Sequence, residues 1–140
     1  ALARENARRL GAEVERRCVF MLADMLFPLF KKHSLNLLVS NPPYISKEDY
    51  AQLDREVAAY EPRGALLSPE GGLRHLEALE EFARTSLTPG GALLLEIGCE
   101  QGKNALRLFE RAPRYWSAVE LHRDLAGLPR IIRARRSLVC

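Results

Sequence analysis

The sequence predicts an α/β domain built on a mainly parallel β-sheet. Three observations support this class: short apolar runs alternate with segments of helical period, Gly and Pro residues separate them, and the chain closes on two short runs joined by a turn. Strands that alternate with helices are typical of parallel sheets. The short final connection, Gly127-Leu128-Pro129, predicts that the last two strands form an antiparallel hairpin at the edge of the sheet.

The first part of the chain predicts helices and strands in turn. Residues 2–10 carry apolar side chains at helical spacing and end at Gly11, so we expect an amphipathic helix with a glycine cap. Val14–Leu22 is rich in apolar and β-branched residues and is predicted to be a strand. Leu35–Ser40 is a second apolar run, and the prolines that follow it must take the chain out of the sheet. Residues 47–60 have apolar side chains every three to four positions, as in a complete or partial helix.

The second part continues the alternation. Leu73–Leu87 places its apolar residues on one helical stripe, and Pro89-Gly90-Gly91 ends this pattern. The expected elements are a turn at Pro69–Gly72, helices over Leu73–Leu87 and residues 103–112, and strands over Ala92–Ile97, Tyr115–Leu121 and Ile131–Arg135.

Composition narrows the class of protein further. A chain of 140 residues with 47% hydrophobic and 28% charged residues fits one globular domain over residues 1–140. Its apolar runs are far shorter than the ~20 residues of a membrane span, so no membrane association is expected. The scattered cysteines and histidines argue against a disulfide framework or a metal site and favour a reducing intracellular compartment. The net charge is +3, and residues 107–136 hold eight arginines against three acidic residues, which we interpret as a solvated basic surface and not as a direct nucleic-acid binding site.

Ser40-Asn41-Pro42-Pro43-Tyr44 carries the clearest chemical signal. It directly follows a predicted buried strand, at the carboxyl edge where open α/β sheets bind ligands. The two prolines stiffen the backbone and carry no N–H, so carbonyl groups there can accept hydrogen bonds from a ligand. Asn41 adds an amide oxygen and Tyr44 adds a flat ring. Two acceptors beside a ring suit a planar NH2 group, and we interpret the segment as a binding site for such a group.

This segment resembles the shared motif (D/N/S)-P-P-(Y/F) of S-adenosylmethionine-dependent methyltransferases that act on planar amino nitrogens. More narrowly, the chain resembles the HemK/PrmC family, the glutamine-N5 methyltransferases of peptide-chain release factors. Glu61-Pro62 and Arg123–Gly127 separate this family from other enzymes with the same motif. The matching residues are 3–7, 10–11, Asp24, 39–45, 60–62, 65–66, 71–73, 89–91, 94–98, 101–102, 123–127 and Arg130, over nearly all 140 residues.

The resemblance implies a Rossmann-like class I methyltransferase fold and N5-methylation of the glutamine in the Gly-Gly-Gln motif of a class 1 release factor. The implied cofactor is S-adenosyl-L-methionine, and the implied compartment is the bacterial cytoplasm or an organelle. The family's catalytic pair corresponds to the Asn41 side chain and the Pro42 carbonyl, which would accept the two protons of the glutamine NH2. Pro43 and Tyr44 would complete the substrate site, with Tyr44 packed against the glutamine.

On the cofactor side, the resemblance places Asp24 and Met25 beside the adenine, together with Asn41. Met25 stands where the family often has another large apolar or aromatic residue. A complete family member also has, before the first helix, a helical docking domain, a strand with a Gly-rich loop, and a strand that ends in an acid for the ribose. This chain shows none of them, so we expect it to be the C-terminal portion of a catalytic domain and to bind the cofactor weakly or not at all by itself.

Two alternatives stay open from the residues alone. Leu93–Gly102 has the pattern of a strand, glycines and a helix, so it could be the cofactor loop of a permuted N6-adenine or N4-cytosine DNA methyltransferase, with Glu120 as the ribose acid. Glu100 in the slot of the central glycine and the absence of a segment that could read a base argue against this interpretation. The second alternative is a folded fragment that does not catalyse.

The resembled family also predicts how the strands pair. Its strand order is 3-2-1-4-5-7-6, of which this chain would keep strands 3, 4, 5, 6 and 7. Val14–Leu22 would then lack both strands that separate it from Leu35–Ser40. We expect it to pair directly with that strand, to swap with a second molecule, or to stay poorly ordered, because a buried strand needs partners for its backbone.

Overall fold

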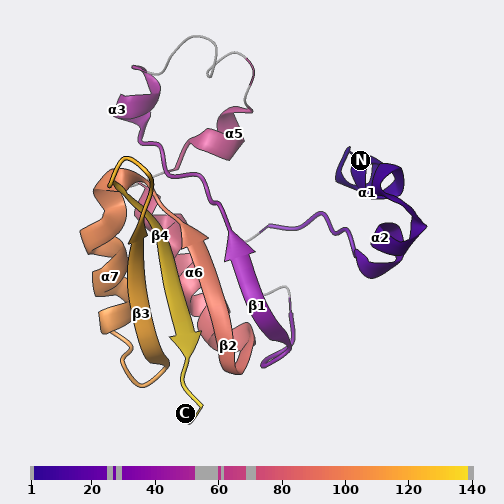
Figure 1. Cartoon of the computed structure of the whole chain (residues 1–140). Coiled ribbons are helices and arrows are strands. Elements are labelled where there is room, and N and C mark those ends of the chain that lie inside the picture. Colours follow the sequence, from indigo (N-terminus) through magenta and orange to yellow (C-terminus); the bar gives the residue numbers. More distant parts are fainter. Residues whose placement is uncertain are drawn as a thin grey trace.

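The computed structural model describes residues 2–24, 27, 30–52, 60, 62–68 and 72–138. Its main feature is a four-stranded sheet in the order β1-β2-β4-β3 (Figure 1). The strands are β1 (Leu35–Ser40), β2 (Leu87–Glu96), β3 (Trp116–Arg123) and β4 (Pro129–Arg136). β1 and β2 are parallel, whereas β4 is antiparallel to both β2 and β3. The α/β class and the antiparallel edge hairpin are confirmed, and the strand order agrees with the 4-5-7-6 part of the expected sheet.

The helices agree with the sequence patterns where those patterns are long. The helices are α1 (Leu2–Leu10), α2 (Ala12–Arg17), α3 (Lys47–Tyr50), α5 (Arg63–Leu66), α6 (Leu73–Ser86), the 3-10 helix η2 (Cys99–Gln101) and α7 (Gly102–Glu110). Predicted helices at α1, α6 and α7 are confirmed within about two residues. α3 covers only the start of the helix expected over residues 47–60, since residues 53–59 lie outside the described residues, as does most of the turn expected at Pro69–Gly72.

α6 and α7 pack against one face of the sheet and form the hydrophobic core with it (Figure 1). Inside this core the ring of Phe109 meets that of Trp116 edge-on, with 5.1 Å between the centroids. The indole Nε1 of Trp116 donates to Glu80 Oε1 at 2.8 Å, which satisfies two buried polar groups at once. The core therefore anchors the β3 edge to α6 and holds the carboxyl ends of β1 and β2 in place.

β2 begins five residues before the predicted strand. Leu35 of β1 pairs with Leu87, and Leu37 pairs with Ala92, so the register jumps across Pro89-Gly90-Gly91. These three residues form a bulge within the strand instead of a break before it. Pro89 is exposed, so its missing N–H removes no hydrogen bond between the strands. Bulges of this kind accommodate proline in a strand.

The predicted strand Val14–Leu22 is wrong. Its first half belongs to α2, where Glu13 forms an ion pair with Arg17 at helical spacing, 2.9 Å between the charged atoms. Cys18–Asp24 has no regular secondary structure, and the Leu22 side chain is fully exposed. The segment does not pair with β1, whose partner in the described sheet is β2. α1 and α2 instead pack on each other, to one side of β1 (Figure 1).

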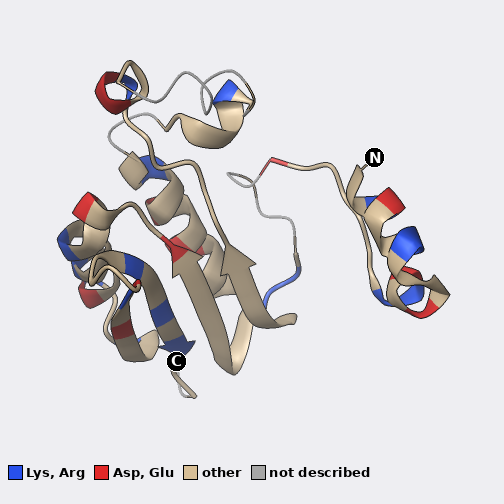
Figure 2. Cartoon of the chain, turned by 45° about the horizontal axis from the view of Figure 1, so that its top comes forward, with Lys and Arg blue, Asp and Glu red and all other residues tan. Residues whose placement is uncertain are grey.

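The basic residues near the C-terminus lie on α7, in the turn that follows it and on the β3–β4 hairpin (Figure 2). Several of them are used within the fold. Arg133 contacts Glu120 at 3.3 Å, Arg135 donates to the Gly90 carbonyl at 3.1 Å, and the buried Arg136 donates to the carbonyl of Leu87. The first contact joins β3 to β4, and the other two tie the hairpin to β2. No helix in the part of the chain that the structure describes is long and apolar enough to cross a membrane.

Candidate functional site

The NPPY segment lies where the sequence predicts it, directly past the carboxyl end of β1 and beside that of β2. Ser40 still pairs with Leu95, so the segment starts from a fixed point of the sheet. Asn41 is exposed, whereas Pro42 is fully buried. The proline ring therefore fixes the backbone where the chain leaves the sheet, and the asparagine side chain faces solvent beside it.

A second anchor holds the far end of the segment. The Ile45 N–H donates to the Leu66 carbonyl at 3.0 Å, and the Ser68 N–H donates to the Ile45 carbonyl at 2.9 Å. These bonds form an isolated parallel bridge between Ile45 and Leu67. Because both ends are tied to other parts of the chain, the backbone between them is preorganised.

The two predicted acceptors are available for a ligand. Within the described residues, no hydrogen bond involves the side chain of Asn41, and the Pro42 carbonyl accepts none from the backbone. An asparagine oxygen and a carbonyl on a rigid turn can take both protons of one NH2 group. The geometry of the segment is therefore compatible with the predicted role of these two residues.

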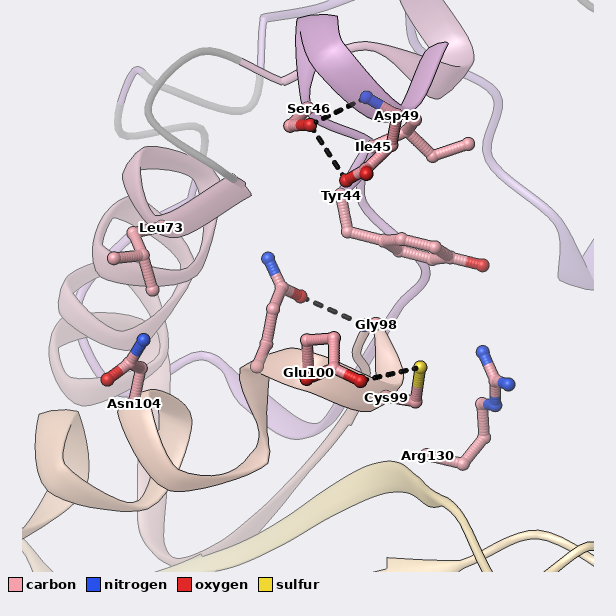
Figure 3. Close-up of a pocket in the computed structure, with 11 residues that line it drawn as sticks. Tyr44, Ile45, Ser46, Asp49, Leu73, Gly98, Cys99, Glu100, Asn104 and Arg130 are labelled. Atoms are coloured by element: carbon pink, nitrogen blue, oxygen red, sulfur yellow. Dashed lines mark hydrogen bonds between the residues drawn. The ribbon is translucent and has the colours of Figure 1, made fainter. Parts of the chain in front are cut away.

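A cavity of about 560 Å³ opens on the side of the motif where Tyr44 lies (Figure 3). The Tyr44 ring covers Gly98, and a Cβ on that glycine would lie 3.2 Å from Tyr44 Cδ2. The cavity joins the end of β1, the start of α6, the loop after β2, and β4. Its described lining is Tyr44, Ile45, Ser46, Asp49, Leu73, Gly98, Cys99, Glu100, Gln101, Asn104 and Arg130.

The glycine loop after β2 is closed by its own residues. The Gly98 N–H donates to Gln101 Oε1 at 2.9 Å, and the Gln101 N–H donates to the Gly98 carbonyl at 2.9 Å. Gly102 packs against the hairpin, where an added Cβ would lie 3.0 Å from Pro129 Cβ. A loop that binds the cofactor's carboxylate needs open N–H groups, but here the Gly98 N–H is used and Glu100 adds a negative charge. The permuted interpretation of Leu93–Gly102 is therefore not favoured.

Gly72, at the start of α6, completes the packing around Tyr44. Its φ is +83°, a conformation that favours glycine. A Cβ there would overlap Gln101 Nε2 and would lie 3.0 Å from both Cα and the carbonyl oxygen of Tyr44. Three segments that are distant in the sequence thus approach as closely as glycine allows.

Arg130 reaches the cavity from β4 and is held by Asp124 of the hairpin turn. Its Nε and Nη2 donate to Asp124 Oδ2 at 3.3 and 3.2 Å. The other carboxylate oxygen accepts the N–H groups of Ala126 and Leu128, both at 3.0 Å. The bond from the Leu128 N–H, followed by those from Arg130 and Ala126, lowers the pKa of Asp124, and the bond to Asp124 raises the pKa of Arg130. In the sequence both residues match the resembled family without an assigned role, and the available signal was an Asp followed by turn residues with an Arg six positions later.

Asp24 and Asn41, the described residues among those predicted to bind the cofactor, do not line this cavity. Asp24 is exposed, and its charge acts on His75 in the first turn of α6, where it raises a pKa that burial and Arg74 lower. His75 Nδ1 lies 2.5 Å from Ser68 Oγ, a hydrogen bond that ties α6 to the segment bridged with Ile45. Met25 lies outside the described residues. No group of three or more His, Cys, Asp or Glu side chains in the described ranges could hold a metal ion.

Comparison with known proteins gives a consistent result. No family model matches the chain. It is 46% identical over 139 residues to a release factor glutamine methyltransferase of Nitratidesulfovibrio vulgaris strain Hildenborough, which covers 99% of this chain and 46% of that protein. A protein of the same name from Bordetella pertussis strain Tohama I is 41% identical over 131 residues, 94% of this chain and 46% of that protein. A solved structure of a possible exported protein from Bordetella parapertussis shares the fold, with a TM-score of 0.59, 17% identity, and coverage of 96% of this chain and 49% of that one.

The strand order and the position of the NPPY segment define a partial class I methyltransferase fold. The sequence relatives then indicate a group within that class: over nearly its whole length the chain is similar to part of proteins named release factor glutamine methyltransferase. It spans slightly less than half the length of these curated relatives.

Proposed function

We propose that this chain supplies the methyl-acceptor side of an enzyme that methylates a glutamine side-chain nitrogen of a class 1 release factor, in the bacterial cytoplasm. The observation that carries the proposal is the NPPY segment, which is anchored at both ends at the carboxyl edge of two parallel strands. Among the residues that the structure describes, the Asn41 side chain has no hydrogen bond, and the Pro42 carbonyl accepts none from the backbone. The relatives' names support the same activity, and they belong to proteins about twice as long as this chain.

The mechanism follows from the low nucleophilicity of an amide nitrogen. Its lone pair is delocalised into the carbonyl group, so it is a poor nucleophile that depends on exact placement. The Asn41 oxygen and the Pro42 carbonyl would each accept one N–H of the glutamine, and the Tyr44 ring would restrain the plane of the amide. S-adenosylmethionine, when bound, supplies an electrophilic methyl group. After a methyl group has been added, the nitrogen can lose one of its protons to water, so no strong base is required beside it.

The described residues fit the methyl acceptor better than the cofactor. We propose that Asn41 lies between the two, with Asp24 and Met25 on the cofactor side. Asp24, however, lies near His75, and the glycine loop after β2 is closed by Gln101. Within the described residues neither feature leaves an open cofactor site, so we expect the 140-residue chain to bind the cofactor weakly.

A chimera tests the proposal. The 140 residues replace the matching segment of the Nitratidesulfovibrio vulgaris relative, and the product is incubated with labelled S-adenosylmethionine and a purified release factor. We expect label on the glutamine of the Gly-Gly-Gln motif, located by mass spectrometry of the digested release factor. The unmodified relative is the positive control. A chimera that folds and binds the cofactor but labels another residue, or none, would overturn the proposed function.

A further inference from the structure

The cavity beside Tyr44 has the size of a ligand site and has no assigned occupant. Its volume of about 560 Å³ lies within the usual range for ligand pockets, roughly 300–1,000 Å³. One side chain of the glutamine would fill only part of it. The cavity begins at the Tyr44 ring, so a substrate that presents its glutamine to Asn41 would continue into this space on one side.

The lining of the cavity suits a neutral peptide main chain. Asp49 and Glu100 offer carboxylate acceptors, Asn104 offers both a donor and an acceptor, and Arg130 offers a donor. A main chain presents N–H and C=O groups in alternation, so it needs such a mixed wall. A phosphate or carboxylate would instead meet two negative side chains, and the one cation in the described lining is already paired with Asp124.

Arg130 is the fixed donor of this wall. Two of its nitrogens are bonded to Asp124, whereas Nη1 makes no hydrogen bond within the described part of the chain. The guanidinium lies on the same side of the cavity as the Tyr44 hydroxyl (Figure 3). Its side chain is 31% exposed, so it is reachable from solvent yet held in one direction. A cation held by a carboxylate can present one N–H to a carbonyl at little entropic cost.

We propose that this cavity binds the substrate main chain next to the target glutamine, and that Arg130 fixes it by donating from Nη1 to a peptide carbonyl. The proposal rests on the proposed function, because it takes the substrate to be a glutamine within a peptide. It adds a binding residue from the C-terminal hairpin to a site otherwise built from the NPPY segment.

The test is a peptide titration of the full 140-residue chain, labelled with 15N and followed by NMR. Acetyl-Gly-Gly-Gln-amide is the probe, because it has no terminal charge that could bind Arg130 unspecifically. We expect shifts of the backbone amides of Tyr44 and Gly98 and of the Arg130 Nε–H signal. Arg130→Met should weaken binding about tenfold or more, as expected for one lost charge-assisted hydrogen bond. Arg130→Lys, which keeps a cationic donor, should lose less.

Arg133→Met is the matched control, because it removes the same charge from the same strand at an exposed ion pair outside the cavity. It should bind the peptide like the unchanged chain. The proposal would be overturned if the Arg130→Met variant bound the peptide with unchanged affinity, or if no binding occurred up to about 10 mM peptide. It would also be overturned if the peptide shifted only signals of other surfaces, or if inorganic phosphate shifted the Arg130 signal more strongly than the peptide does. The readout is binding and not methyl transfer, so peptide binding without transfer by the chimera would refute the proposed function alone.

Discussion

Substitution of Gly72 by Ala tests the close packing that holds Tyr44. The structure predicts two separate penalties at this position. Its φ of +83° strains any residue with a Cβ by about 1–2 kcal/mol, which the lower entropy of the unfolded alanine chain offsets by about 0.4–1 kcal/mol. The Cβ would also meet the Tyr44 backbone at 3.0 Å and overlap the Gln101 amide, and such overpacking costs about 1–3 kcal/mol. The expected total is a loss of about 2–4 kcal/mol in the free energy of unfolding.

Two other glycines separate these penalties. Gly127 has a φ of +78° with no heavy atom within 4 Å of an added Cβ, so Gly127→Ala should show only the backbone strain less the entropy offset, a net loss of about 0.5–1 kcal/mol. Gly64 lies in α5 with open space and no positive φ. Gly64→Ala should be neutral or stabilise the chain by up to about 1 kcal/mol, since alanine favours helix over glycine.

Urea unfolding followed by circular dichroism measures all three variants, with the midpoint compared at constant slope. The difference between the Gly72 and Gly127 variants isolates the close approach to Tyr44 and Gln101. If both variants lost the same free energy, the packing of α6 against the NPPY segment would be refuted, even though the backbone conformation of Gly72 could still be right.

Three further outcomes are expected. Asn41→Ala in the chimera should lower the rate of glutamine methylation by about 10²-fold or more while the melting temperature stays unchanged; an unaltered rate would show that Asn41 has no catalytic role. The unmodified 140-residue chain should bind S-adenosylmethionine with a dissociation constant above about 1 mM by calorimetry, whereas micromolar binding would revive Gly98–Gly102 as a cofactor loop. Burial and the charge of Arg74 lower the pKa of His75, so the unfolded state takes up the proton first and the free energy of unfolding should fall as the pH drops below about 6.5. His75→Gln, measured by urea unfolding between pH 7.5 and 5, should flatten this dependence, and an unchanged slope would contradict the assignment.

The parts of the fold that the sequence predicted are those set by local pattern. The apolar stripe of Leu73–Leu87 and the run Leu35–Ser40 need no distant information, and both elements formed as expected. The early start of β2 depends on a partner, because only pairing with Leu35 turns Pro89 and its neighbours into a bulge. Val14–Leu22 failed for the same reason: apolar and β-branched composition describes a strand only when another strand lies beside it.

The candidate site divides in the same way. The NPPY segment is contiguous, so its position at the end of β1 followed from the sequence. Arg130 lines the cavity because its hydrogen bond to Asp124, in the hairpin turn, orients the side chain toward it. Asp49 lines the cavity because the bridge at Ile45 places α3 near the loop after β2. Neither placement is encoded in spacing alone, since each depends on contacts between segments far apart in the chain.

The glycines after β2 show that a function can be inferred from a glycine motif only when its hydrogen bonds are known. Gly98 and Gly102 indicate positions where another group lies close to the backbone. The sequence does not say whether that group is a phosphate, a cofactor or a side chain of the protein itself, because each of them needs glycine in the same way. At Gly98 the approaching group is the Tyr44 ring, and the Gln101 side chain takes the N–H that a ligand would need. The loop therefore packs against the protein itself: Gly98 accommodates the Tyr44 ring, and Gly102 accommodates Pro129 of the hairpin.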